Sequence, residues 1–247
     1  NAVPEWVHAD MGILCAGGVS SGIYPTDSSS QVEYLVNDSR TKVIFAEDEE
    51  QLDKILTCRA RCPSLQKIIV FDMEGLSGFT DEALWQEMID SRSAGDLAIL
   101  VYTSGTTGRP KGVPRSHRVE RAAALAHIAQ SRYGQGERSL GVMPFYHTMG
   151  VRSLLASALV DGLLVCQPRF DVAGCLAAIA GERVTNLFLV PTLYHDLLAS
   201  PAFETTDTKS VTKLGFAGAS MTDGLLQRLD AAFRPELFVN HYGSSEI

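Results

Sequence analysis

The sequence contains no run of about 18 consecutive apolar residues, the length that a membrane-spanning helix needs, so no integral membrane span is expected. Its first residues carry no secretory signal pattern. Basic residues are outnumbered, because 21 Lys and Arg stand against 29 Asp and Glu and give a formal net charge of −8. This balance argues against a nucleic-acid partner or a broad anionic-membrane surface, so any phosphate site must be a local feature.

Paired cysteines are missing as well. The five cysteines include no C-x-x-C pair, which argues against a zinc site or a redox motif. Cys58 and Cys62 are four residues apart, but no histidine or second cysteine pair lies nearby, so two ordinary thiols are favoured over a metal site. Scattered cysteines are typical of a reducing compartment, and a cytoplasmic location is expected.

One stretch changes abruptly from apolar residues to hydroxyls and glycines. Leu97–Tyr102 predicts a buried strand, and the segment after it predicts a tight loop. The glycines of this loop let backbone N–H groups approach an anion, its hydroxyls add donors, and Lys111 adds a positive charge. The candidate phosphate ligands are Thr103, Ser104, Gly105, Thr106, Thr107, Gly108 and Lys111.

This loop is not the P-loop of NTPases. That motif places its lysine directly after a glycine and a hydroxyl residue directly after the lysine. Here Pro110 precedes Lys111 and Gly112 follows it. The sequence therefore indicates a different phosphate-binding chemistry.

Helices and strands are expected to alternate along the chain. The expected helices cover residues 4–16, 30–38, 47–61, 81–91, 116–133, 153–159, 172–182, 193–199 and 224–233. The expected strands cover residues 23–24, 43–46, 68–71 and 97–102 and lie near Leu140, Leu163, Leu187, Leu214 and Phe238. Repeated β-α units predict an α/β fold of layered, mostly parallel sheets with flanking helices.

Three further segments follow expected strands, at the edge where open α/β sheets bind ligands. Residues 142–150, V-M-P-F-Y-H-T-M-G, place His147 before a helix, where alone a cap or packed side chain would explain it. Residues 214–220, L-G-F-A-G-A-S, form an ordinary β-α turn or one whose glycine lets a flat ring approach. Residues 238–246, F-V-N-H-Y-G-S-S-E, offer Tyr242 for stacking and Glu246 as an oxygen ligand for Mg²⁺.

Together these segments resemble the motifs of the adenylate-forming superfamily, which includes acyl- and aryl-CoA ligases, luciferases and peptide-synthetase adenylation domains. Tyr102–Val113 resembles its signature loop, and the His147 segment resembles its Pro-x-x-His-x-x-Gly stretch. The last segment resembles its Tyr-Gly-x-[Ser/Thr]-Glu motif, with Ser245 in place of the more usual threonine. Residues 1–6 and 22–26 look like the early region of acyl-CoA synthetases, so the resemblance covers essentially the whole chain.

The resemblance implies an acid–thiol ligase that uses ATP or AMP, Mg²⁺ and coenzyme A. A carboxylate would attack the α-phosphorus of ATP, and the CoA thiol would then displace AMP. The implied catalytic residues are His147, Ser245 and Glu246, and the implied metal ligands are Glu246 and Thr106. Besides the loop, the implied nucleotide contacts are Gly218, Ala219, Ser220, His241, Tyr242, Gly243 and Ser244. The implied substrate pocket consists of His147, Thr148, Met149, Gly150, Ala217, Gly218 and His241.

The resemblance also implies a domain organisation. Residues 1–247 would be a partial N-terminal ATP/AMP-binding domain, with a first α/β part over 1–96. The phosphate loop and the acyl and adenine sites would occupy 97–247. Family enzymes continue into a mobile C-terminal lid domain with a catalytic lysine, so an incomplete fragment, impaired or inactive alone, is expected.

The substrate is a carboxylic acid whose class the sequence leaves between two alternatives. The first residues look like fatty acyl-CoA synthetases, whereas the stretch from His147 to Glu246 is also close to aryl-CoA ligases of the chlorobenzoate type. A fatty acid is favoured. Two other functions stay open: a nucleotide-binding fragment without turnover, and a peptide-synthetase adenylation domain, which an adjoining carrier-protein segment would favour. A homodimer is also left open.

Overall fold

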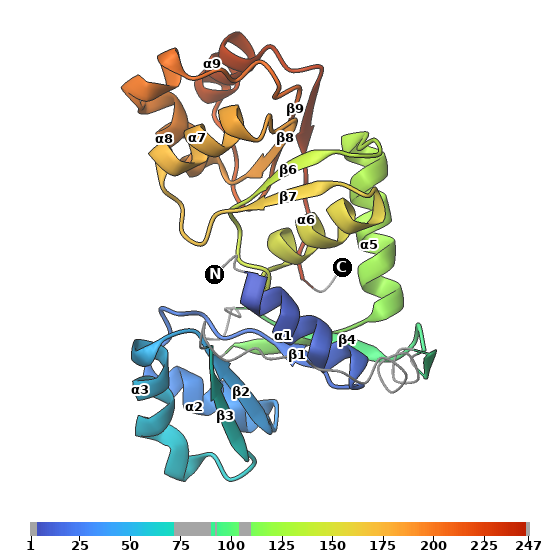
Figure 1. Ribbon diagram of the computed structural model, residues 1–247, viewed down its shortest axis with the longest axis vertical. Helices are drawn as coiled ribbons and strands as arrows, with labels where there is room; N and C mark the ends of the chain where they lie inside the picture. The colour runs from blue at the N-terminus through green and yellow to red at the C-terminus, as the bar shows by residue number, and fades with distance from the viewer. Residues whose placement is uncertain (1–3, 72–89, 92, 104–109, 246–247) are drawn as a thin grey trace. The chain divides into compact units, whose positions relative to one another are not determined.

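A computed structural model describes residues 4–71, 90–91, 93–103 and 110–245 (Figure 1). The chain forms two compact units. One contains residues 7–116, and the other contains residues 1–6 and 117–247. No helix in the described ranges is both long and apolar enough to cross a membrane.

The unit of residues 7–116 contains two small sheets within its described part. In the first, β1 pairs in parallel with β4, and β4 pairs antiparallel with β5. In the second, β2 pairs in parallel with β3. The elements are α1 (Pro4–Cys15, which starts in the other unit), β1 (Ser20–Ser21), α2 (Ser29–Asp38), β2 (Val43–Ala46), α3 (Glu49–Cys58), a 3₁₀ turn (Arg59–Arg61), β3 (Lys67–Val70), β4 (Leu97–Thr103) and β5 (Lys111–Ser116).

The other unit is built on a parallel sheet whose described strands follow the order β10-β9-β8-β6-β7. Each of its strands leads into a helix or a loop at the carboxyl edge. The elements are α5 (His117–Ser131), β6 (Arg138–Gly141), α6 (Thr148–Leu159), β7 (Leu163–Cys166), α7 (Val172–Gly181), β8 (Asn186–Leu189), α8 (Pro191–Ala199), a 3₁₀ turn (Pro201–Thr205), β9 (Lys213–Phe216), α9 (Asp223–Phe233) and β10 (Leu237–Asn240). The predicted α/β class with mostly parallel sheets and flanking helices is confirmed.

Local signals in the sequence account for several of these boundaries. Ser28 and Gln31 form a capping box at the start of α2, and Asp171 accepts a backbone N–H at the start of α7. Pro191 occupies the first turn of α8, where its missing N–H is harmless. The helix expected over residues 81–91 falls largely outside the described residues.

One predicted strand is wrong. Ile23 and Tyr24 lie outside any strand, and the short β1 covers Ser20–Ser21 instead. The backbone of Tyr24 is engaged in a turn, because its N–H donates to Asp27 Oδ2 at 3.2 Å and its carbonyl accepts from the Asp27 N–H at 2.9 Å. These turn hydrogen bonds take the place of the strand pairing that we expected for the apolar residues Ile23 and Tyr24.

The two faces of the five-stranded sheet differ in polarity. One face packs against α7, α8 and α9 through an apolar core that includes Leu140, Leu187, Leu214 and Phe216 (Figure 1). The alternate residues of the same strands, which point the other way, include the polar Ser139, Asn186 and Lys213 besides Gly215 and Phe188. Parallel sheets covered on both faces are normally apolar on both, so this polar face needs its own explanation.

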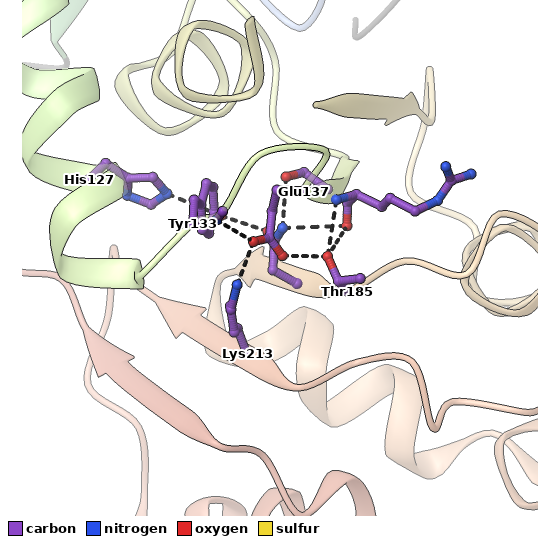
Figure 2. Close-up of polar contacts among 9 residues, drawn as sticks. His127, Tyr133, Glu137, Thr185 and Lys213 are labelled. Atoms are coloured by element: carbon purple, nitrogen blue, oxygen red, sulfur yellow. Dashed lines mark hydrogen bonds and ion pairs between the residues drawn. The ribbon is translucent and has the colours of Figure 1, made fainter. Parts of the chain in front are cut away.

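A buried ion pair lies where β6, β8 and β9 begin (Figure 2). Lys213 Nζ and Thr185 Oγ1 both donate to the Glu137 carboxylate, and the Gly134 N–H donates to it at 3.1 Å. Burial alone would raise the pKa of Glu137, but these hydrogen bonds more than offset it and hold the pKa below its ordinary value of 4.5. The pair therefore fixes the starts of three neighbouring strands.

We predict that Glu137→Gln lowers the free energy of unfolding by about 3 kcal/mol, because it leaves the Lys213 ammonium partly buried without its counter-ion. The wild-type chain also loses stability as the pH falls below 4.5, because the folded-state pKa of Glu137 is the lower one and the carboxylate that holds Lys213 becomes protonated. Urea unfolding at pH 7 and at acid pH measures both effects. Glu182→Gln, at the exposed pair with Arg138, is the control and costs about 0.5 kcal/mol or less. Equal losses in the two variants would contradict the prediction.

Candidate functional site

The predicted phosphate loop lies between two paired strand ends. Thr103 ends β4 and Lys111 begins β5, and the two residues are antiparallel partners. Lys111 and Gly112, expected in the loop, are therefore strand residues. Ser104, Gly105, Thr106, Thr107 and Gly108 lie outside the described residues.

Helix α2 holds both strands that flank this loop. The Tyr34 hydroxyl donates to the Pro110 carbonyl at 3.1 Å, one residue before β5. The Tyr102 hydroxyl donates to Asp38 Oδ2 at 2.7 Å. Burial, together with this bond, raises the pKa of Tyr102, so the hydroxyl stays a donor at neutral pH. Tyr34 on α2 and Tyr102 on β4 thus tie this helix to both strand ends that flank the loop.

In the other unit, His147 caps the helix that follows β6. Its Nδ1 accepts the Met149 N–H at 3.2 Å, as an N-cap side chain does. Burial lowers the pKa of His147, so the ring is neutral and keeps its acceptor nitrogen at physiological pH. Gly150 follows in the first turn of α6, where an added Cβ would lie 2.0 Å from the Pro144 carbonyl oxygen. Only glycine fits this close approach of helix and preceding turn.

A hydrogen bond joins this helix start to the last motif of the chain. Thr148 Oγ1 and Ser245 Oγ lie 3.2 Å apart, although 97 residues separate them. The backbone of His241 supports the same segment, because its N–H donates to the Phe216 carbonyl at 2.8 Å and extends the pairing of β10 with β9. Two predicted substrate and phosphate segments therefore meet at the carboxyl edge of one sheet. Glu246, the next residue after Ser245, lies outside the described residues.

The predicted adenine segments are open to solvent. Gly218 has a φ of +83°, a conformation that favours glycine, and Ala219 and Ser220 after it are exposed. Ala217 is half-buried directly after β9. The Tyr242 side chain is 97% exposed, and Gly243 and Ser244 beside it are exposed too. These residues present backbone and one aromatic face to an incoming ligand.

His241 lies in a cluster of rings under this edge. Its ring centroid is 4.8 Å from that of His127 and 4.9 Å from that of Phe188. Its Nε2 lies 3.4 Å from Ser131 Oγ. Burial, and then the charge of Arg152, lowers the pKa of His241 to about 4, so this ring is neutral.

The sequence reasoning missed this second layer of polar side chains, including His127. The structure reveals it, because the buried residues of α5 are Glu120, Ala124, His127 and Ser131, spaced as one face of a helix. Three of those four residues are polar, which is unusual for a buried helix face. The part of the chain that the structure describes holds no group of three His, Cys, Asp or Glu side chains suited to a metal ion.

Comparison with known proteins defines the class of this chain. The model of the AMP-binding enzyme family matches residues 1–247, so the chain belongs to the AMP-binding enzyme family. The 4-chlorobenzoate–CoA ligase of Pseudomonas sp. strain CBS-3 is 32% identical over 220 residues, which are 87% of this chain and 40% of that protein. The long-chain-fatty-acid–CoA ligase ACSBG2 of Rattus norvegicus is 26% identical over 243 residues, 88% of this chain and 36% of that protein. The chain thus spans less than half the length of these relatives.

Solved structures share the fold. The N-terminal domain of FACL13 from Mycobacterium tuberculosis, solved with an inhibitor, superposes with a TM-score of 0.83 at 23% identity, over 98% of this chain and 60% of that chain. The anthranilate CoA ligase AuaEII in complex with anthranoyl-AMP also gives a TM-score of 0.83 at 23% identity, over 98% of this chain and 48% of that chain. The predicted likeness to the N-terminal domain of acyl-CoA synthetases is confirmed at the level of fold.

We predict that Gly150→Ala lowers the free energy of unfolding by about 2 kcal/mol or more, because the new Cβ displaces the turn at Pro144 from the start of α6. Gly224→Ala, also in the first turn of a helix, meets no atom within 4 Å and should leave stability unchanged or raise it by up to about 1 kcal/mol. Thermal unfolding of both variants measures the difference. Equal behaviour of the two would show that the close approach at Gly150 is not a constraint.

Proposed function

We propose that this chain is the nucleotide-binding part of an ATP-dependent carboxylate–CoA ligase. The observation that carries the proposal is the 3.2 Å contact between Thr148 and Ser245, which brings the predicted substrate segment to the predicted α-phosphate segment. The family match over residues 1–247 and the order of the motifs support the same function. A contact between these two segments is what a reaction between a carboxylate and an α-phosphate requires.

In the proposed reaction a carboxylate oxygen attacks the α-phosphorus of ATP and pyrophosphate leaves, which gives an acyl-adenylate. The thiol of coenzyme A then attacks the acyl carbon and AMP leaves. No covalent bond to the protein forms, so catalysis consists of positioning and charge stabilisation. The protein must hold the two reacting groups in line and exclude water from them.

Each predicted residue has a proposed task in this reaction. Residues 103–111 bind the β- and γ-phosphates, and Ser245 donates to the α-phosphate. The exposed ring of Tyr242 stacks on adenine, and the bare backbone at Gly218 lies along it. Neutral His147 borders the substrate carboxylate with Thr148. Glu246, with the hydroxyl of Thr106, binds Mg²⁺, which prefers oxygen ligands and would neutralise phosphate charge.

Two classes of carboxylic acid, fatty and aromatic, are candidate substrates. The resemblance of the first residues to fatty acyl-CoA synthetases favours a fatty acid. The match to a Pseudomonas protein named 4-chlorobenzoate–CoA ligase favours an aromatic acid. Both use the same chemistry at the carboxylate. The difference between them lies in the pocket that holds the rest of the acid.

We predict that Glu246→Gln in the full-length protein lowers carboxylate-dependent ATP–pyrophosphate exchange by about 10²-fold, because the neutral amide is a weaker Mg²⁺ ligand at the reacting phosphates. Glu236→Gln, at an exposed position ten residues earlier, is the matched control and should retain full exchange. Undiminished exchange in the Glu246 variant would refute the metal role.

We predict that Tyr242→Ala raises the Kd for ATP about tenfold or more, since stacking of a base on an aromatic ring contributes about 1–3 kcal/mol. Tyr242→Phe keeps the ring and should bind ATP as the wild type does. Because the ring is exposed, neither change should disturb the fold, and equilibrium binding with a fluorescent ATP analogue measures both. Equal affinities of the Ala and Phe variants would exclude stacking.

A further inference from the structure

A small cavity lies on the polar face of the five-stranded sheet, under α5. Its walls include His127, Ser131, Phe188, Gly215 and Val239, and the polar residues Tyr133, Asn186 and Lys213 line it toward the starts of the strands. The space inside is about that of one water molecule. His241, predicted to line the substrate pocket, packs on the rings of His127 and Phe188, so two walls of the cavity contact a residue of the predicted pocket.

The hydrogen bonds around His127 define which of its nitrogens carries the proton. Asn186 Nδ2 donates to Ser139 Oγ at 2.8 Å and to the Arg138 carbonyl at 3.4 Å, which fixes the orientation of this amide. Asn186 Oδ1 therefore accepts the single hydroxyl proton of Tyr133, at 2.6 Å. The Tyr133 oxygen then accepts from His127 Nε2 at 3.2 Å, so Nε2 bears the proton (Figure 2).

This tautomer leaves His127 Nδ1 as an acceptor. The side chain is 2% exposed, and Nδ1 has no hydrogen-bond partner within the described residues. Burial, and then the neighbouring His241 and Arg152, lowers the pKa of His127 to about 3, so Nδ1 is not protonated at neutral pH. A buried acceptor without a donor is unfavourable, and a ligand that brings an O–H or N–H would relieve it.

The walls of the cavity also indicate the shape of that ligand. The rings of His127, Phe188 and His241 have centroids 4.8–4.9 Å apart and form a packed cluster, in which His127 and Phe188 are buried and His241 is half-buried. An added Cβ on Gly215 would lie 3.1 Å from Phe188 and 3.4 Å from His241, so glycine lets these rings pack against the strand. A flat body would stack on half-buried His241, and the cavity has room for one oxygen or nitrogen atom rather than for an alkyl chain.

We propose that this pocket selects a compact aromatic carboxylic acid with a hydroxyl or amino substituent, whose donor group enters the cavity and binds His127 Nδ1. The inference rests on the proposed ligase function and names its substrate class. It differs from the fatty acid that the first residues of the sequence favoured. His127 acts here as a specificity-determining residue.

The test uses the full-length protein and compares carboxylic acids that differ in one hydrogen-bond donor group. The kcat/KM of ATP–pyrophosphate exchange is measured with 3- and 4-hydroxybenzoate, their methoxy analogues, benzoate and decanoate. We expect one hydroxy acid to exceed benzoate, its methoxy analogue and decanoate by about tenfold or more, because a site built to hydrogen-bond a hydroxyl rejects analogues that lack it. Equal values for the hydroxy acids and benzoate would overturn the proposal.

Variants of His127 separate recognition from packing. His127→Phe keeps a ring but has no acceptor, and the preference for the hydroxy acid should fall below about twofold. His127→Asn places an amide oxygen near the position of Nδ1 and should retain part of the preference. His195→Phe, at an exposed position on α8, is the matched control and should leave the preference unchanged. A preference that survives His127→Phe in a folded protein would also overturn the proposal.

Binding without turnover distinguishes failure of the inference from failure of the proposed function. Titration calorimetry with 4-hydroxybenzoate, 3-hydroxybenzoate and benzoate in the absence of ATP reports on the pocket alone. Tighter binding of a hydroxy acid without exchange for any acid would refute the ligase and keep the pocket assignment. Exchange with several acids and equal Kd values for hydroxy acids and benzoate would keep the ligase and refute the role of His127.

Discussion

The parallel order of β6, β8, β9 and β10 is the constraint on which the rest of the site depends. Parallel strands end at the same edge, so the segments after β6 and β10 meet there although they are far apart in sequence. The hydrogen bond between Thr148 and Ser245 is the direct sign of that meeting, across 97 residues. The buried pair of Glu137 and Lys213 supports it from the opposite edge, where it ties the starts of the strands together.

The polar face of this sheet contains a buried group that does not favour folding. On the other face, Leu187 and Leu214 pack in an apolar core of the usual kind. Burying polar groups is unfavourable unless each finds a partner. Asn186, Tyr133 and Ser139 satisfy one another, but His127 Nδ1 has no partner in the described part of the chain. An apolar residue would fill the same space without that penalty, which is why we connect His127 with a ligand rather than with folding.

Much of the fold follows from local signals in the sequence. The strand at residues 43–46 has the predicted bounds, and a helix follows His147 as expected, although it begins at Thr148 rather than at residue 153. Ile23 and Tyr24 failed as a strand because Asp27 captures the backbone of Tyr24 in a turn. Lys111 begins a strand because it pairs with Thr103 across the β4–β5 hairpin, a register that composition does not reveal.

The motif residues of the candidate site were predictable from the sequence, but the buried polar residues beneath them were not. Ser245 and Thr148 stand in recognisable segments, whereas His127 belongs to an alanine-rich helix whose buried face is not marked by large apolar residues. Contacts between α5 and the sheet decide its role, and these depend on the tertiary fold. The polar inner pocket is therefore visible only in the structure.

The most direct test of the central claim is a crystal structure of this chain with a non-hydrolysable acyl-adenylate analogue, an acyl-sulfamoyl adenosine. We expect the linker between acyl group and adenosine to lie against Thr148 and Ser245, with the adenine on the ring of Tyr242. An analogue bound away from this sheet edge, or no binding at all, would contradict the account.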